Sequence, residues 1–158
     1  MTRGSSGTTA AAHASSQTVI RDDATPSGEL SWNATTKTLT VKGTIFIDGS
    51  VRITNGQLNT YNGQATLYLS GTFRMTGSLC GSVSAGACTF NTWNPNSEML
   101  TVVANGNGGQ VNPGDSILVD NNYSFQGGLF GTNAIEFGNN VNIGGPVVGS
   151  YIILSNNL

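Results

Sequence analysis

The sequence contains little charge. Asp, Glu, Lys and Arg make up 9% of its 158 residues, and six basic against eight acidic residues give a net charge of −2. Globular domains usually carry about 25% charged residues. A surface that binds nucleic acid or an anionic membrane needs clustered basic residues. We therefore expect no nucleic-acid partner.

Long hydrophobic runs are also missing. The longest, residues 45–47 and 151–154, fall far short of the roughly 20 apolar residues of a membrane-spanning helix, so we expect no membrane insertion. The first ten residues contain one basic residue, Arg3, and no apolar segment of a signal peptide follows it. Residues 1–30 are rich in Ser, Thr, Ala and Gly without an apolar period, which predicts a flexible arm or linker.

Groups that commonly perform catalysis are scarce. The one histidine, His13, lies in the predicted arm, which argues against a Ser/His/Asp triad, a histidine metal site or the general base of a hexapeptide acyltransferase. The acidic residues are scattered. Aligning the repeats described below places Asp48 beside Ser70 and Asp120 beside Gly138, so no carboxylates pair as in carbohydrate-cleaving β-helices. We expect no enzymatic activity, no cofactor and no metal.

There are only two cysteines, Cys80 and Cys88, and a spacer of small residues separates them. A local disulfide is the favoured interpretation, because nothing nearby indicates a metal site or a redox pair. Such a short loop gives a stabilisation of about 2–3 kcal/mol and suits an oxidising, extracellular compartment. Two free thiols in a cytosolic protein are the alternative.

What the sequence does contain, from about residue 30 onward, is a short repeated unit. Two apolar residues flank one arbitrary residue, three turn-like residues follow, and the unit begins again. Because side chains alternate between the two faces of an extended chain, each unit is typical of a very short strand. The units are residues 39–41, 45–47, 51–53, 67–69, 73–75, 100–102, 117–119, 123–125, 135–137, 141–143 and 152–154.

A second, longer period accompanies these units. Leu100, Ile117, Ile135 and Ile152 open equivalent units at steps of 17, 18 and 17 residues. Asn pairs recur at the same place in each repeat and predict a stacked ladder of side chains at a corner, where Asn tolerates a left-handed backbone. The pairs are Asn121 with Asn122, Asn139 with Asn140, and Asn156 with Asn157.

The N-terminal half repeats at a different interval. Residues 44–54 match residues 66–76 at an offset of 22, which places Arg52 beside Arg74. Repeats of this length indicate a solenoid whose coils bury their faces against one another. A β-sandwich explains the alternation equally well, but not the recurrence of Asn and apolar pairs in phase.

We therefore predict an all-β fold, a single parallel β-helix over residues 31–158 with about three faces and 17–18 residues per coil. The right-handed form is favoured because the repeats vary in length. A loop is inserted at about residues 77–98. Its Phe90, Trp93 and Asn94 form a possible recognition site, although packing of this loop onto the coils is favoured over binding.

One group of proteins shares these features. Cys80 and Cys88, followed by residues 94–106 and 125–134, resemble a group of bacterial β-solenoid domains found in exported, pilus-associated or cell-surface proteins. The resemblance covers about residues 40–158. It implies an extracellular or bacterial cell-surface location, with this chain a fragment without its export signal. The six-residue cadence also resembles the bactofilins, filament-forming β-helices, but the cysteine pair and the large loop depart from their pattern.

The leading expectation is a non-enzymatic extracellular structural or adhesive module of a bacterial surface or pilus-associated assembly. Its partners are proteins or further copies that meet the open ends of the solenoid, where strand edges are unpaired. The alternatives are a self-assembling filament subunit of the bactofilin type and a β-helix that binds or processes carbohydrate, with a surface glycan as its ligand.

Overall fold

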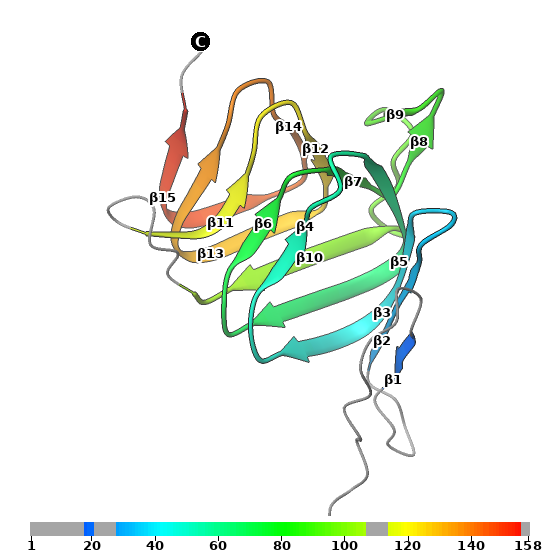
Figure 1. The fold of residues 1–158 in the computed structure, drawn as a ribbon, viewed down its shortest axis with the longest axis horizontal. Helices are drawn as coiled ribbons and strands as arrows, with labels where there is room; N and C mark the ends of the chain where they lie inside the picture. The colour runs from blue at the N-terminus through cyan, green and yellow to red at the C-terminus, as the bar shows by residue number, and fades with distance from the viewer. Residues whose placement is uncertain (1–17, 21–27, 107–113, 156–158) are drawn as a thin grey trace, which may run out of the picture.

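The computed structural model describes residues 18–20, 28–106 and 114–155, and within these ranges the chain forms fifteen β-strands and no helix (Figure 1). In chain order they are β1 (Thr18–Ile20), β2 (Gly28–Asn33), β3 (Thr38–Ile47), β4 (Val51–Ile53), β5 (Leu58–Leu69), β6 (Phe73–Met75), β7 (Ser78–Cys80), β8 (Val83–Ser84), β9 (Ala87–Cys88), β10 (Met99–Ala104), β11 (Asp115–Val119), β12 (Ser124–Gln126), β13 (Gly128–Phe137), β14 (Asn142–Gly144) and β15 (Val147–Leu154).

Thirteen of the described strands belong to one sheet, and β8 and β9 form a separate antiparallel hairpin. Within the large sheet, β2 pairs antiparallel with both β1 and β3. The other pairings between its described strands are parallel. The prediction of an all-β chain with mainly parallel strands is therefore confirmed, and the antiparallel β1 and β2 are an addition to it.

The parallel strands form three ladders, each built from segments that are distant in sequence. Ladder 1 contains β3, β5, β10 and the first halves of β13 and β15. Ladder 2 contains β4, β6, β11 and the second halves of β13 and β15. Ladder 3 joins the start of β5 to β7, β12 and β14. Figure 1 shows β3, β5 and β10 side by side, with β4 and β6 turning away from them at a corner.

The core lies between the ladders and consists of columns of matched side chains. Every second residue of a strand points inward, and the register places it beside the inward residue of the next strand. In ladder 1 the column is Ile45, Leu67, Val102, Leu129 and Val147; in ladder 2 it is Val51, Phe73, Ile117 and Ile135, whose partner Ile152 in the last strand is 47% exposed; in ladder 3 it is Asn59, Leu79, Phe125 and Ile143.

The predicted repeat of 17–18 residues agrees with the observed strand pairing at most positions and is wrong at Leu100. Leu129 pairs with Val147, and Ile135 pairs with both Ile117 and Ile152, as the spacing predicts. The 22-residue match is also correct, since residues 44–47 pair with 66–69 and residues 51–53 with 73–75. Leu100, however, is not equivalent to Ile117. It pairs with Ala65 in ladder 1, whereas Ile117 lies in ladder 2 beside Phe73.

Several strands are longer than the repeated unit predicts. β3 and β13 each span 10 residues and β5 spans 12, because the extended chain runs on past the three turn-like residues. β13 passes from ladder 1 into ladder 2 with a shift in register between Gly131 and Ala134. The corner is therefore a local irregularity of a continuous strand and not a break between two strands.

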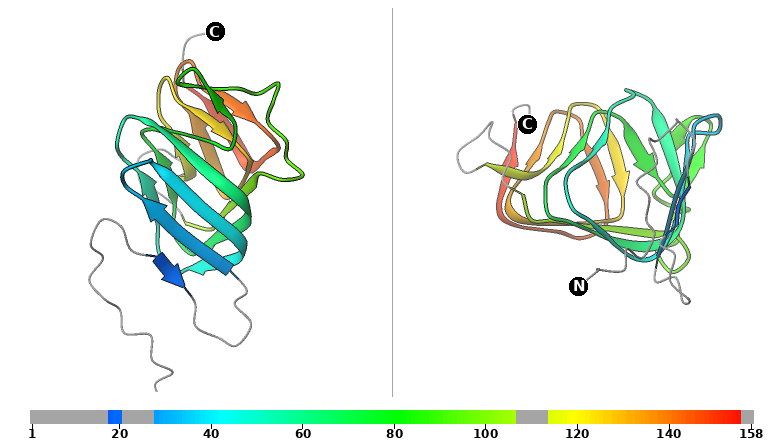
Figure 2. Two further views of the ribbon diagram at one scale, coloured as in Figure 1. Left: turned by 90° about the vertical axis from the view of Figure 1, so that its right-hand side faces the viewer. Right: turned by 60° about the horizontal axis from the view of Figure 1, so that its bottom comes forward.

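The two ends of the sheet differ. β2 lies antiparallel along residues 38–43 of β3, so it covers that part of the outer edge of the first parallel strand. β15 lies at the opposite end and pairs with β13 alone among the described strands (Figure 2). The boundary predicted between arm and domain, at residue 30, falls inside β2. His13 lies outside the described residues.

Candidate functional site

The inserted loop folds back onto the sheet and is closed by a disulfide. Cys80, which ends β7, bonds to Cys88 in the β8–β9 hairpin, with 5.9 Å between their Cα atoms, so the predicted pairing is confirmed. Cys80 is fully buried and pairs in register with Thr60 of β5. Because β7 belongs to ladder 3, the excursion from the sheet covers residues 81–98, a shorter segment than the 77–98 of the sequence prediction.

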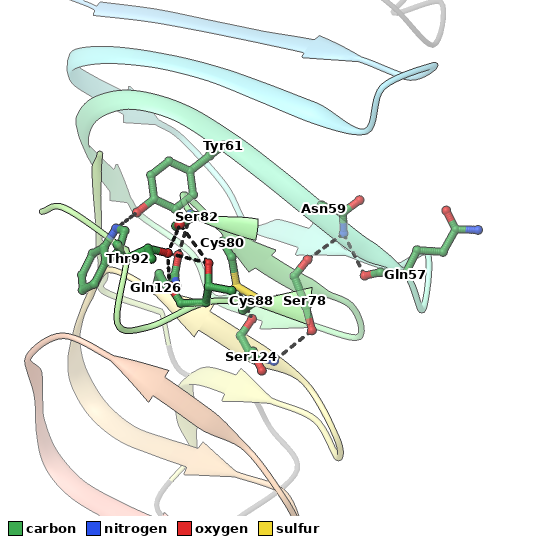
Figure 3. Close-up of a disulfide and its surroundings, with 12 residues drawn as sticks. Gln57, Asn59, Tyr61, Ser78, Cys80, Ser82, Cys88, Thr92, Ser124 and Gln126 are labelled. Carbon is green, nitrogen blue, oxygen red and sulfur yellow. Dashed lines mark hydrogen bonds between the residues drawn. A yellow bond between two sulfur atoms is a disulfide. The ribbon is translucent and has the colours of Figure 1, made fainter. Parts of the chain in front are cut away.

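Hydroxyl groups hold the base of this loop together. The hydroxyl of Ser82 lies 2.9 Å from those of both Thr89 and Thr92, and the backbone N–H of Ser82 donates to Oε1 of Gln126 at 2.8 Å (Figure 3). Gln126, the last residue of β12, is completely buried. These contacts attach the loop to ladder 3 and leave the three hydroxyls engaged with one another.

Trp93 is anchored inside the loop. Its indole N–H donates to the backbone carbonyl of Glu98 at 2.7 Å and lies 3.1 Å from the hydroxyl oxygen of Tyr61. The Tyr61 hydroxyl donates to the same carbonyl at 3.1 Å. The indole N–H is therefore used within the protein and is not presented to a ligand.

The other two predicted recognition residues also have structural contacts. Phe90 lies over Gly144, where a Cβ atom would come within 2.7 Å of its ring. The side-chain oxygen of Asn94 accepts the backbone N–H of Asn96 at 3.0 Å and so forms a turn. The structure thus brings Phe90 and Trp93 together against Gly144 and directs Asn94 into its own turn.

The asparagine pairs meet at one corner of the sheet. The backbone N–H of Asn139 donates to the side-chain oxygen of Asn121 at 2.7 Å, and the side-chain amide of Asn140 donates to Asn122 at 3.0 Å. Asn122 and Asn140 have φ angles of 66° and 55°, the left-handed conformation that Asn adopts at low cost. Asn156 and Asn157 lie outside the described residues.

A surface feature that the sequence reasoning missed lies on the outer face of ladder 1. Five apolar side chains, each from the middle position of a repeated unit or its equivalent, stack in one column across five strands. We call this the apolar column. Its members are Phe46, Tyr68, Val103, Phe130 and Val148.

The apolar column is exposed at both ends. Phe46 is 71% exposed and Val148 is 54% exposed, and the rings of Phe46 and Tyr68 stack with their centres 5.0 Å apart. A neighbouring outward column holds Thr44, Thr66 and Thr101, none of which carries a charge. The sequence signal for this column is the apolar residue at the outward, middle position of each of the five units, because an outward position normally carries a polar residue.

Charged side chains are spread over the outer face of ladder 2. Arg52 and Arg74 are paired in register, as the 22-residue offset predicts, and a guanidinium nitrogen of Arg74 lies 4.0 Å from a carboxylate oxygen of Asp120. Among the described residues, no group of three or more His, Cys, Asp or Glu side chains is placed to hold a metal ion.

Burial raises the pKa of Tyr61 to about 12, because the ring and hydroxyl are removed from water beside Trp93. An unfolded tyrosine loses its proton at about pH 10. Between pH 10 and 12 the folded state therefore retains a proton that the unfolded state releases, and stability falls as pH rises through this window by on the order of 2 kcal/mol. Tyr61→Phe should remove this contribution. Urea denaturation at pH 9 and pH 11.5 checks it: the difference between the two pH values should be smaller in the variant than in the wild type.

No helix in the described part of the chain is long and apolar enough to cross a membrane. Comparison with protein-family models gave no match, and no curated protein and no solved structure matched the chain either.

Proposed function

We propose that the chain is a right-handed β-solenoid that serves as a non-enzymatic structural or adhesive module in a bacterial surface or pilus-associated assembly. The three parallel ladders support the solenoid, because each of them places in register residues from strands distant in sequence, with separations of 17 to 46 residues over the three ladders. Examples are Ile135 with Ile152 in ladder 2, and Leu67 with Val102 in ladder 1 across the inserted loop. Variable coil lengths favour the right-handed form.

An extracellular location is part of the proposal. The Cys80–Cys88 disulfide is compatible with an oxidising compartment, where such bonds persist. The disulfide, the hydroxyl cluster and Trp93 attach the inserted loop to the coils. This attachment stabilises the loop, as an exposed module of a surface assembly requires.

The observation that carries the adhesive role is the apolar column. Phe46, Tyr68 and Val148 are exposed, and the half-buried Val103 and Phe130 connect them across the five strands. The apolar column is therefore a contiguous patch, whereas single exposed apolar residues are ordinary. The parallel register aligns the side chains of the column in one row, and the uncharged threonine column beside it allows close approach to another apolar surface. We propose that this face lies against an apolar surface of the assembly.

Adsorption to an alkyl-coated sensor tests this role. The variant combining Phe46→Ser and Val148→Ser removes the two most exposed side chains of the column and is expected to bind the alkyl layer about tenfold more weakly than the wild type. The matched control combines Tyr151→Ser and Leu154→Ser, which are 57% and 65% exposed and lie outside the column. Equal losses in both variants, or wild-type binding by the column variant, would contradict the proposal.

Electron microscopy of the purified chain distinguishes this role from filament formation. We expect single particles, because the antiparallel β2 occupies the edge of residues 38–43 of β3, where the parallel strand of a second copy would stack. Filaments that form without any added partner would instead favour the bactofilin-like alternative.

A further inference from the structure

A cavity of about 500 Å³ opens into the core at the end of the solenoid where β2 lies. It is distinct from the apolar column and from the inserted loop. Its size is within the range of about 300–1,000 Å³ typical of small-molecule sites. The cavity is lined by Leu30, Trp32, Ala34, Lys37, Leu39, Ile47, Val51, Arg52, Ile53, Thr54, Asn55, Asn59 and Leu67.

The cavity exists because the first coil is only partly covered. Val51 and Ile53 point inward like their register partners Phe73 and Met75 in the next coil. Phe73 and Met75 are fully buried, whereas Val51 and Ile53 are only partly buried. β2 covers residues 38–43 of β3 and does not pair with β4. The inward side chains of Val51 and Ile53 are therefore not covered by β2, and they form one wall of the cavity.

The walls and the rim of the cavity differ in chemistry. Leu30, Leu39 and Ile47 make aliphatic walls, and Trp32 adds a large aromatic surface. Lys37 and Arg52 are the charged residues among the described residues that line the cavity. Arg52 lies between the inward Val51 and Ile53, so its side chain points to the outer face of ladder 2, and the half-buried Lys37 is the cation at the rim.

The position of Lys37 is fixed by the β2–β3 turn. Asn33, the last residue of β2, accepts backbone N–H groups of Thr35 and Thr36 on its side-chain oxygen, at 2.9 and 3.1 Å. Lys37 then adopts a φ of 54°, which is costly for a residue with a side chain, and its carbonyl accepts the N–H of Thr60 at 2.9 Å. The turn therefore holds the lysine at the cavity.

We propose that this cavity binds a fatty acid, with the hydrocarbon tail among the aliphatic walls and the carboxylate paired with Lys37. An uncharged apolar molecule would gain nothing from the lysine. A phosphate-rich ligand would gain nothing from the apolar walls. A carboxylate on an alkyl chain satisfies both parts, because the lysine ammonium can donate charge-assisted hydrogen bonds to it while the tail is removed from water.

Binding of laurate, below the concentration at which it forms micelles, tests the proposal. Laurate is expected to bind saturably in isothermal calorimetry and to change the fluorescence of Trp32, and the fluorescence change should disappear in Trp32→Phe. Dodecanol and dodecyltrimethylammonium have the same tail with a neutral or a positive head, and we expect both to bind at least about tenfold more weakly than laurate. Tighter binding of dodecanol, or of a short apolar peptide with a free carboxyl terminus, would overturn the fatty-acid assignment.

Two further variants separate the cavity from non-specific detergent effects. Lys37→Gln should weaken laurate binding about tenfold, whereas Lys42→Gln, in β3, should leave it unchanged because Lys42 does not line the cavity. Val51→Phe places in the first coil the side chain that its partner Phe73 has in the next, and by filling the cavity it should abolish binding. Urea denaturation checks that each variant is folded. Equal affinity in Lys37→Gln and Lys42→Gln, or undiminished binding by a folded Val51→Phe, would show that the proposal is wrong.

Discussion

Replacing Gly127 with Ala is expected to destabilise the protein by about 4 kcal/mol or more, a large part of the roughly 5–15 kcal/mol that stabilises most domains. Gly127 joins β12 to β13 with a φ of 144°, and its N–H donates to the carbonyl of Gly144 at 2.7 Å. A Cβ atom there would lie 2.1 Å from the backbone oxygen of Leu100. Because that oxygen belongs to the neighbouring strand β10, relieving the clash requires separating two strands of ladder 1. Urea denaturation followed by circular dichroism measures the loss.

Gly49 provides the matched control. Its φ of 141° is almost the same, but no atom of the described residues lies within 4 Å of the position where its Cβ would be. Gly49→Ala should therefore cost only the backbone strain, about 1–3 kcal/mol. If the two variants lose equal stability, strain alone explains the requirement for glycine, and the close approach of Gly127 to β10 contributes nothing.

The close approach of neighbouring strands at Gly127 belongs to a repeating structure, and the repeat is visible in the sequence. The matches between Leu129 and Val147 and between residues 51–53 and 73–75 could be predicted because apolar and turn residues recur together. The error at Leu100 has a physical cause. Leu100 in β10 belongs to ladder 1 and Ile117 in β11 belongs to ladder 2, so the 17-residue step between them leads from one ladder to another and not between neighbouring strands of one ladder. Both strands carry inward apolar residues, so the apolar pattern alone does not distinguish the two ladders, and only the pairing of β10 with β5 decides.

The direction of β2 was not predictable from alternation. Leu30 and Trp32 alternate with Ser31 as they would in a strand of either direction, and the predicted parallel β-helix began at residue 31. The tight turn after Asn33, closed by its side chain, reverses the chain and makes β2 antiparallel. The cavity near Arg52 follows from this reversal and could not be read from the spacing.

The candidate recognition loop was only partly predictable. The spacing of Cys80 and Cys88 was sufficient for the disulfide, because a short flexible spacer closes easily. The role of Trp93 depends on Tyr61, which is 32 residues earlier in the chain, so no local pattern indicates it. The apolar column, in contrast, could have been found from the middle residues of the units around Phe46 and Tyr68.

Phe125→Ala is expected to cost about 3–5 kcal/mol, the usual range for removing a fully buried Phe side chain. Phe125 belongs to ladder 3 and is completely buried, and its ring meets that of Phe73 from ladder 2 edge to face, with centres 6.2 Å apart. The two rings therefore connect ladder 2 with ladder 3 across the core. Because both rings are buried between their ladders, the cavity left by Phe125→Ala cannot close without moving both ladders.

Phe46→Ala removes an identical side chain from the outer face of ladder 1 and is expected to cost less than about 1 kcal/mol, since that ring is mostly exposed. A double-mutant cycle of Phe73→Ala and Phe125→Ala measures the contact between the two rings, and an edge-to-face pair predicts a coupling of about 0.5–1.5 kcal/mol. Chemical denaturation of the wild type, the two single variants and the double variant provides the four free energies of unfolding. Strictly additive losses would mean that Phe73 and Phe125 stabilise their own ladders independently, and that the faces are held together at the corners instead of through the core.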